Sequence, residues 1–494
     1  MAELSLPVGR VPQFKGEVEV PGSKSISNRL LLMNYLAGDP LASIRGLSTA
    51  GDTLRMQNVL AALKLPHSDG EVGVGDAGTV MRFVLPLLCL SPGTHHMTGT
   101  ERAHERPIGP LVDALRLLGA QIQYLGRAGC LPLKIEGGTA LRMPDGLDAL
   151  PIDAGMSSQF VSALMMLAPC IEGGLRLRLI ARAVSRPYLL LTRDLMREWG
   201  VPIEFIHENN INIPQCTYQP PARVEVEPDW SSAAYWLAWT ALMPQSELFV
   251  PNLKRGSVQA DAICVDAFAD LGVHSIERDG GLLLSNCPMK MPSASTNQTK
   301  NPMPYASTDQ TKNMMPYAST HQAKNMMSCA STDQTKNPMS AEWLEYADLG
   351  SSTFKPGEGH STLQFSGLDS PDLIPTAMVL CALKGRAARF TELETLREKE
   401  SDRLGGLMHG LRSLGARIDE REPGSYRLMQ GIPQASTQGQ VYDLHTQGDH
   451  RMAMAFSLLA SHGYGVRPDR PEVVGKSYPG YWQALERLGM RWQP

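Results

Sequence analysis

The sequence predicts an α/β protein whose helix–strand units are grouped into two or more domains. The chain has 494 residues, more than a single hydrophobic core usually organises. Hydrophobic residues make up 43% of it, which is enough to fill more than one core. One pattern also recurs along the chain: an amphipathic helix that ends in glycine and is followed by a short apolar run.

In this pattern, leucines three and four residues apart place one helical stripe against a sheet. The glycine can adopt the left-handed conformation that ends a helix and turns the chain. The closing glycines are, in order, Gly119, Gly200, Gly272, Gly415 and Gly489, in segments 111–122, 191–203, 265–276, 406–418 and 481–492. A weaker copy at 56–68 lacks the glycine. Most gaps between these glycines exceed the roughly 20 to 50 residues of a solenoid repeat, so α/β units grouped into domains fit better than a solenoid. The alternative is that helix–glycine–strand units are simply common in α/β proteins.

A segment past the middle of the chain has a different composition. Four copies of a twelve-residue repeat begin at Ala294, Ala306, Ala318 and Ala330. They are rich in Ser, Thr, Asn, Gln and Pro and have no helical or strand pattern of apolar residues, so burial cannot offset the entropy of ordering them. We therefore expect a disordered surface insertion at about 294–341 with no part in the chemistry.

Charge and cysteine content exclude several functions. Lys and Arg number 46 against 50 Asp and Glu, and this net charge of −4 argues against nucleic-acid binding. The eight cysteines are scattered without a CxxC pair, which argues against zinc and iron–sulfur sites and indicates reduced thiols. The first residues lack a signal-peptide layout, and the apolar runs are broken by proline before ~20 residues, so a cytoplasmic protein without membrane contact is expected.

The stretch "PGSKSISNR" at 21–29 contains half of a phosphate-binding loop. A P-loop needs glycine directly before the lysine, whereas Ser23 precedes Lys24 here, so that pattern fails. What remains is a helix start in which Ser25 and Arg29 share one face, with Lys24 beside free N–H groups. A carboxylate or phosphate fits this arrangement, and an ordinary serine cap with solvated cations is the alternative.

Further segments offer anion-binding groups of the same kinds. "GDAGTVMR" at 75–82 is a glycine-rich turn that opens a helix and lets backbone N–H groups approach a ligand. The other candidates are Arg106 before a proline-started helix, Ser157, Ser158 and Gln159 in "MSSQF", Ser185 and Tyr188 in "VSRPY", Lys399, Glu400 and Arg403 in "REKESDR", His450 and Arg451 in "GDHRM", and Lys476 in "VGKSYPGY". Each has an ordinary alternative, such as a solvated charged helix face for 397–403.

Together the motifs resemble the 5-enolpyruvylshikimate-3-phosphate synthase family of enolpyruvyl transferases. The matching phrases run in family order from residue 21 to residue 482: "PGSKSISNR", "GDAGTVMR", "ERPIGPLVDALR", "SSQF", "VSRPY", "SPDLIPTAM", "REKESDRL", "GDHRMAM" and "GKSYPGYW". Only the repeats and their flanks fall outside the resemblance. It implies transfer of the enolpyruvyl group of phosphoenolpyruvate to the 5-hydroxyl of shikimate 3-phosphate, a step of aromatic amino acid biosynthesis that needs no cofactor.

The resemblance also implies a role for each site residue. Shikimate 3-phosphate would be bound by Lys24, Ser25, Arg29, Ser157, Ser158, Gln159, Ser185, Tyr188, Asp372, Thr395 and Lys399. Phosphoenolpyruvate would be bound by Lys24, Gly78, Arg106, Gln159, Arg403, His450, Arg451 and Lys476. Asp372 would be the base for the 5-hydroxyl, and Glu400 with Lys24 would donate the proton to the methylene carbon.

Two positions depart from the family pattern, and two other functions stay open. Asp76 and Thr395 each stand where many members have asparagine, and either change could weaken binding. One alternative is the sister transferase that acts on UDP-N-acetylglucosamine, but its loop cysteine has no counterpart in "ERAHERPIG" at 101–109. The other is a non-catalytic anion-binding homologue.

The fold that the resemblance implies has two domains, at 21–227 and at 1–20 with 228–494. Each would be a pseudo-threefold assembly of βαβαββ units with helices inside and sheets outside. Cations from both domains would face one another and close on the ligands, and the resemblance favours a monomer.

Overall fold

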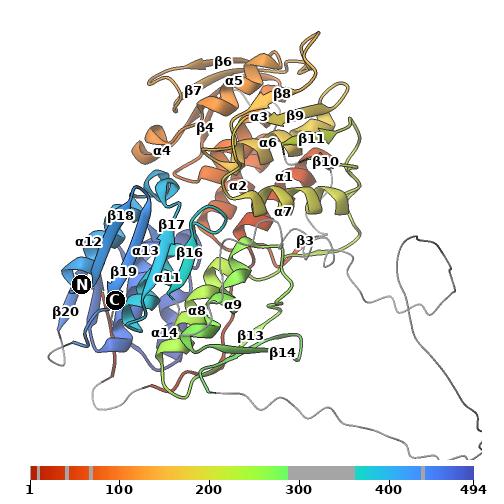
Figure 1. The fold of residues 1–494 in the computed structure, drawn as a ribbon. Coiled ribbons are helices and arrows are strands. Elements are labelled where there is room, and N and C mark those ends of the chain that lie inside the picture. Colours follow the sequence, from red (N-terminus) through yellow and green to blue (C-terminus); the bar gives the residue numbers. More distant parts are fainter. Residues whose placement is uncertain are drawn as a thin grey trace, which may run out of the picture. The chain divides into compact units, whose positions relative to one another are not determined.

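The computed structural model describes residues 2–7, 12–38, 44–65, 70–207, 209–287, 362–435 and 440–493, all within one compact unit (Figure 1). The repeats at 294–341 lie outside the described residues, so the disordered insertion stays a prediction. In the described ranges, every helix is too short or too polar to cross a membrane.

Two hydrophobic cores organise the described chain, each around a set of central helices. The first core is built from residues between Ile26 and Val226 and contains α1 (Lys24–Ala37), α3 (Gly78–Leu90) and α6 (Ser158–Leu167), which contact one another. The second core takes Leu4, Phe14 and Val18 together with residues from Trp230 onward. At its centre α11 (Ile374–Leu383) packs on α8 (Trp230–Leu242) and α13 (His450–Ser457). The proline-interrupted apolar runs of the sequence are therefore core helices that are buried on nearly all sides.

Four-stranded mixed sheets cover these helices, and those of the first core follow one βαβαββ plan. In the first sheet, β4 (Gly70–Gly73), α3, β5 (Gly93–Thr98), α5 (Gly109–Leu117), β6 (Gln121–Tyr124) and β7 (Leu133–Gly137) give the order β4-β5-β7-β6. In the second, β8 (Leu150–Ile152), α6, β9 (Leu175–Leu179), α7 (Arg186–Glu198), β10 (Glu204–Ile206) and β11 (Asn210–Ile213) give the order β8-β9-β11-β10. In each, a parallel pair is extended by an antiparallel hairpin. The short strand β3 (Ile44–Arg45), which precedes α2 (Gly51–Ala62) in the chain, pairs in parallel with β12 (Val224–Glu225).

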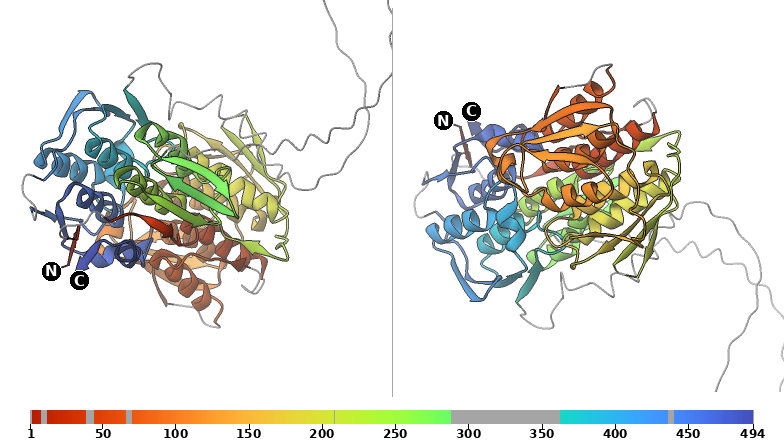
Figure 2. Two further views of the ribbon diagram at one scale, coloured as in Figure 1. Left: turned by 90° about the horizontal axis from the view of Figure 1, so that it is seen from below. Right: turned by 90° about the horizontal axis from the view of Figure 1, so that it is seen from above.

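The second core repeats the plan, and the N-terminal strands complete two of its sheets. One sheet has the order β16 (Leu363–Ser366), β17 (Ala388–Thr391), β19 (Ser425–Gln430), β18 (Arg417–Glu422), with α11 and α12 (Arg403–Ser413) between strands. Another has the order β20 (Val441–Leu444), β21 (Gly465–Pro468), β1 (Glu3–Ser5), β22 (Arg491–Gln493), with α13 and α14 (Tyr481–Arg487). The third has the order β14 (His274–Arg278), β15 (Gly281–Ser285), β13 (Glu247–Pro251), β2 (Lys15–Glu17), with α8 and α9 (Cys264–Ala267). Because β1 pairs with β22, the two termini lie side by side in every view (Figures 1 and 2).

The five predicted helix-closing glycines have the left-handed backbone that the sequence pattern requires. Their φ values are 103° at Gly119, 78° at Gly200, 94° at Gly272, 91° at Gly415 and 93° at Gly489. The glycine-free segment at 56–68 falls on α2, which ends at Leu63 in a right-handed conformation. The repeated helix–turn–strand unit is thus present in both cores, and the α/β class is confirmed.

The chain passes between the cores twice, and the two crossings are hydrogen-bonded to each other. Ser23 N donates to Glu227 O at 2.8 Å, and Asp229 N donates to Pro21 O at 2.9 Å. Gly22 is needed here because a Cβ would lie 1.9 Å from the carbonyl oxygen of Gly46. Asp229 caps α8 and also accepts from Lys24 N at 3.2 Å, so the crossing fixes the start of α1.

Candidate functional site

A cavity that is partly open to solvent is lined by the first residues of seven helices. These helices are α1, α2, α3, α6 and α7 of the first core and α12 and α13 of the second. Helix starts carry free N–H groups and a partial positive charge, so such a cavity favours anions.

The cavity brings together all but one of the residues predicted from the motifs. Those that line it are Lys24, Ser25, Arg29, Gly78, Arg106, Ser157, Ser158, Gln159, Ser185, Tyr188, Asp372, Thr395, Lys399, Glu400, Arg403, His450 and Arg451. Lys476, at the end of the 3-10 helix η7 (Pro471–Lys476), is not among the lining residues but contacts Glu400, which is. Candidates separated by more than four hundred positions in the chain therefore meet at one place.

Arg29 is a buried cation without an acidic partner in the described part of the chain. It donates through Nε to Thr192 Oγ1 at 2.7 Å and through Nη1 to Ser25 O at 2.8 Å. Its guanidinium carbon lies 5.2 Å from the ring centre of Phe83 and 5.8 Å from that of Tyr188. Burial lowers the pKa of Arg29 to about 10, so it stays charged at neutral pH. An unpaired buried charge is costly, and an anionic ligand would relieve that cost.

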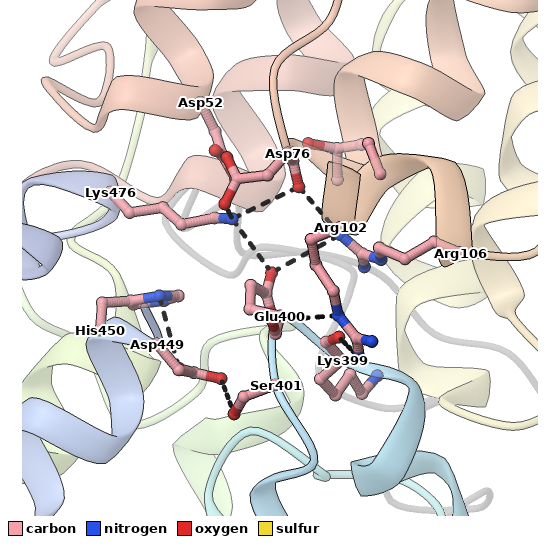
Figure 3. Close-up of polar contacts among 12 residues, drawn as sticks. Asp52, Asp76, Arg102, Arg106, Lys399, Glu400, Ser401, Asp449, His450 and Lys476 are labelled. Carbon is pink, nitrogen blue, oxygen red and sulfur yellow. Dashed lines mark hydrogen bonds and ion pairs between the residues drawn. The ribbon is translucent and has the colours of Figure 1, made fainter. Parts of the chain in front are cut away.

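Glu400 lies among three cations that come from both cores, and Figure 3 shows two of them, Arg106 and Lys476. Its Oε2 is 2.7 Å from Arg403 Nη2, and its Oε1 is 3.7 Å from Lys476 Nζ and 4.0 Å from Arg106 Nη1. Burial alone would raise the pKa of Glu400, but Lys476, Arg403 and Arg106 outweigh it and hold the pKa well below the usual range. The carboxylate is therefore ionised while no other anion occupies these cations.

Asp372 is held in the same way by two arginines of the second core. Its Oδ1 lies 2.7 Å from Arg403 Nη1, and its Oδ2 lies 2.8 Å from Arg451 Nη2. Burial would raise the pKa of Asp372, but Arg451 and Arg403 hold it below the usual range. Like Glu400, it occupies cations that a bound anion would compete for.

Asp449, which the motif analysis missed, anchors the two arginines. It is fully buried, accepts from Arg403 Nε at 2.7 Å and from Ser401 Oγ at 3.1 Å, and caps α13 through the N–H of Arg451 at 2.8 Å. It lies at a helix start and belongs to the quoted motif "GDHRM", so the motif itself could have identified it. One buried carboxylate thus positions both cations that hold Asp372.

His450 is also buried, and neither ring nitrogen has a hydrogen-bond partner among the described residues. Burial, and then Lys24 and Arg451, hold the pKa of His450 well below its usual range, so the imidazole is neutral. Its unpaired nitrogens are available to a ligand in the cavity.

Several further lining residues were not predicted, among them Asp52 and Arg82. Asp52 of α2 accepts from Lys24 Nζ at 3.1 Å. Arg82, in the middle of α3, donates to Gln159 Oε1 at 2.7 Å and to Pro107 O at 3.0 Å. Burial, and then Arg106, lower the pKa of Arg82 to about 9. Arg82 belongs to the quoted motif "GDAGTVMR", so the motif itself could have identified it.

Fold and site define a class: α/β proteins with two helical cores and a cavity whose helix starts and cations suit small, multiply charged anions. Within the described residues, no group of His, Cys, Asp and Glu has the arrangement of a metal site.

Comparison with known proteins narrows this class. The family model for EPSP synthase (3-phosphoshikimate 1-carboxyvinyltransferase) matches residues 10–293 and 360–485. A 3-phosphoshikimate 1-carboxyvinyltransferase of Bacteroides fragilis is 33% identical over 97% of this chain and 96% of that protein. One of Cellvibrio japonicus is 30% identical over 96% of this chain and 97% of that protein. The chain belongs to the EPSP synthase family of carboxyvinyl transferases.

Solved structures agree on the fold. The EPSP synthase of Acinetobacter baumannii superimposes with a TM-score of 0.63 at 18% identity, covering all of both chains. The enolpyruvyl transferase NikO of Streptomyces tendae gives 0.58 at 13% identity, covering 100% of this chain and 98% of that one. The predicted enolpyruvyl transferase fold is confirmed.

Proposed function

We propose that the chain transfers the enolpyruvyl group of phosphoenolpyruvate to the 5-hydroxyl of shikimate 3-phosphate and releases phosphate. The observation that supports this most is the cavity at which seven helix starts converge with the cations. Each substrate carries a carboxylate and a phosphate, so the pair brings roughly five to six negative charges. Seven predicted cations meet there: Lys24, Arg29, Arg106, Lys399, Arg403, Arg451 and Lys476.

On the shikimate 3-phosphate side, Arg29 and Ser25 bind the carboxylate. The unpaired charge of Arg29 supports this role, and the hydroxyls of Ser157, Ser158 and Ser185 at the starts of α6 and α7 suit a phosphate. The remaining contacts to this substrate are made by Lys24, Gln159, Tyr188, Asp372, Thr395 and Lys399. Thr395 Oγ1 is buried without a partner, so it can hydrogen-bond the ligand.

On the phosphoenolpyruvate side, Arg106, Arg403, Arg451 and Lys476 bind the charged groups with His450, Gln159 and Lys24. Gly78 leaves the space that Arg106 fills, because a Cβ there would lie 2.6 Å from Arg106 Nη2. Phosphoenolpyruvate would thus take over cations that Glu400 and Asp372 occupy in the empty enzyme.

This exchange of partners supplies the catalytic acid and base. As the substrate anions neutralise Arg403, Arg451 and Lys476, the pKa values of Asp372 and Glu400 rise. Asp372 then accepts the proton of the 5-hydroxyl while the oxygen of that hydroxyl attacks C2 of phosphoenolpyruvate. Glu400 with Lys24 delivers a proton to C3, giving a tetrahedral intermediate. The intermediate then loses a proton from C3 and phosphate from C2, which completes the transfer.

We further propose that the two cores are the two domains, divided at residues 20 and 227, and that they close on the substrates. The hydrogen-bonded crossings at Pro21 and Asp229 support a hinge there. Shikimate 3-phosphate should reduce the radius of gyration in solution scattering, and an unchanged radius would contradict closure. The cytoplasmic location and monomeric state remain predictions, the second testable by light scattering.

A phosphate-release assay tests the reaction. Phosphate should appear only when phosphoenolpyruvate and shikimate 3-phosphate are both present, and chelators should not reduce the rate. With UDP-N-acetylglucosamine in place of shikimate 3-phosphate, no phosphate should be released. This result distinguishes the chain from the sister transferase, which acts on that sugar nucleotide. A folded protein that binds both substrates and releases no phosphate would instead be the non-catalytic homologue.

A further inference from the structure

Arg102 reaches from the first core to the backbone of the segment that carries Lys399 and Glu400 (Figure 3). It lies on the short helix α4 (Glu101–Glu105). Its Nη2 donates to Lys399 O at 2.8 Å and to Arg397 O at 3.4 Å, and its Nε donates to Glu400 O at 3.2 Å. One guanidinium therefore holds three carbonyl groups of the second core.

The helix that carries Arg102 is fixed to the first core. Thr100 caps it, accepting from Ala103 N at 3.4 Å, and Thr100 N donates to Gly75 O at 3.1 Å. The His104 ring lies 3.1 Å from Thr98 Oγ1 at the end of β5. Arg102 thus extends from a platform that is joined to the glycine-rich turn of the cavity.

The segment that Arg102 holds has no regular structure of its own. Residues 399–402 lie between the 3-10 helix η5 (Glu394–Glu398) and α12, outside any helix or strand. The side chains of Lys399 and Glu400 point into the cavity, whereas Arg102 is not among its lining residues. The planar fork of a guanidinium can fix several acceptors in one geometry, which an ammonium does less well.

We propose that Arg102 is a positioning residue: when the cores meet, it sets the backbone of residues 399–400 and so places Lys399 and Glu400 for the reaction. The inference rests on the proposed function. Arg106 follows α4 directly and approaches the Glu400 carboxylate, while Arg102 donates to the Glu400 carbonyl. Glu400 is therefore contacted at two points by residues 102–106. The ion pair of Arg102 with Glu105 at 2.7 Å is exposed and contributes little, so the carbonyl contacts carry the effect.

The chain offers a matched control. Arg182 also pairs across the cores, with Glu392 at 3.2 Å, but both side chains are largely exposed and neither lines the cavity. Wild type, Arg102→Ala, Arg102→Lys and Arg182→Ala are compared by turnover of the two substrates. Amide hydrogen exchange of a peptide spanning residues 394–406 is measured in parallel, with thermal unfolding to check folding.

In Arg102→Ala we expect kcat to fall about tenfold to a hundredfold and the 399–402 amides to exchange at least about tenfold faster, with KM changed less. Arg102→Lys should lie between it and wild type, and Arg182→Ala should match wild type in both readouts. The proposal would be overturned if the 399–402 amides of Arg102→Ala exchanged at the wild-type rate. It would also be overturned if Arg182→Ala lost as much turnover and amide protection as Arg102→Ala. A wild-type protein without turnover would refute the proposed function instead, while the exchange data would still decide the role of Arg102.

Discussion

Asp76 and Lys476 form an ion pair between the two cores, with Oδ2 2.6 Å from Nζ. The backbone oxygen of Asp76 also accepts from Arg106 Nη1 at 2.9 Å and from Lys476 Nζ at 3.4 Å. A carboxylate of the protein thus occupies a cation that we assign to phosphoenolpyruvate. The family pattern has asparagine at position 76, and a neutral asparagine would form no ion pair with Lys476.

Asp76→Asn should therefore tighten phosphoenolpyruvate binding. The substitution removes one of the two carboxylates that pair with Lys476, Glu400 being the other. Because Asp76 is 41% exposed, the expected gain is modest, about threefold to tenfold in KM at low salt. The gain should shrink as ionic strength rises. The exposed pair of Asp113 with Arg116 provides a control, since Asp113→Asn should leave KM unchanged. A higher KM in Asp76→Asn would show that Asp76 assists binding.

Arg29→Met should separate stability from binding. Arg29 has no acidic partner in the described residues, and Ser162 Oγ and Thr192 Oγ1 remain paired with each other at 2.9 Å without it. Replacing an unpaired buried charge by an apolar side chain is often neutral or stabilising. We expect an unchanged or higher Tm, together with a rise of more than about a hundredfold in KM for shikimate 3-phosphate.

Thermal shift with shikimate 3-phosphate measures both effects of Arg29→Met. The ligand should raise the Tm of wild type and not that of the variant. Arg29→Lys, which keeps the charge without the fork, should recover binding in part. A variant that unfolds earlier but still binds would mean that Arg29 serves the core rather than the ligand.

The fold was predictable where local physics decides it, and the site only in part. Leucine spacing and a closing glycine identify the helix–turn–strand units because both act within a few residues. The pairing of β1 with β22 was beyond reach, since it joins the ends of the chain. The cavity residues were found by motif, but a motif does not tell which charges neutralise one another. The ion pairs of Asp449 with Arg403 and of Asp52 with Lys24 became visible only in the folded chain.

Asp372→Asn should lose turnover much more than affinity. The amide keeps the shape but cannot accept the proton of the 5-hydroxyl, so kcat should fall by about 10²–10⁴. The change also removes a negative charge from Arg403 and Arg451, so KM for phosphoenolpyruvate should stay level or fall. Steady-state kinetics separate the two quantities. If KM rose while kcat was kept, Asp372 would be a binding residue and not the base.

The alkaline limb of the pH profile should report Lys399. Burial lowers the pKa of Lys399, and Arg403 and Arg106 lower it further against the opposing effect of Asp372 and Glu400. The ammonium that binds the substrates exists below this pKa, so kcat/KM should fall as the pH rises through the lowered value. Because arginine stays protonated, Lys399→Arg should move the limb upward by more than about one pH unit.

Lys384 supplies the matched control for this limb. Burial also lowers its pKa, but it donates to Ala241 O at 3.1 Å and does not line the cavity. Lys384→Arg should therefore leave the limb in place. Since kcat/KM follows the ionisations of the free enzyme, it is the quantity to plot against pH. If Lys399→Arg kept the wild-type limb, another group would control alkaline activity, and the contact of Lys399 with the substrates would lose its support.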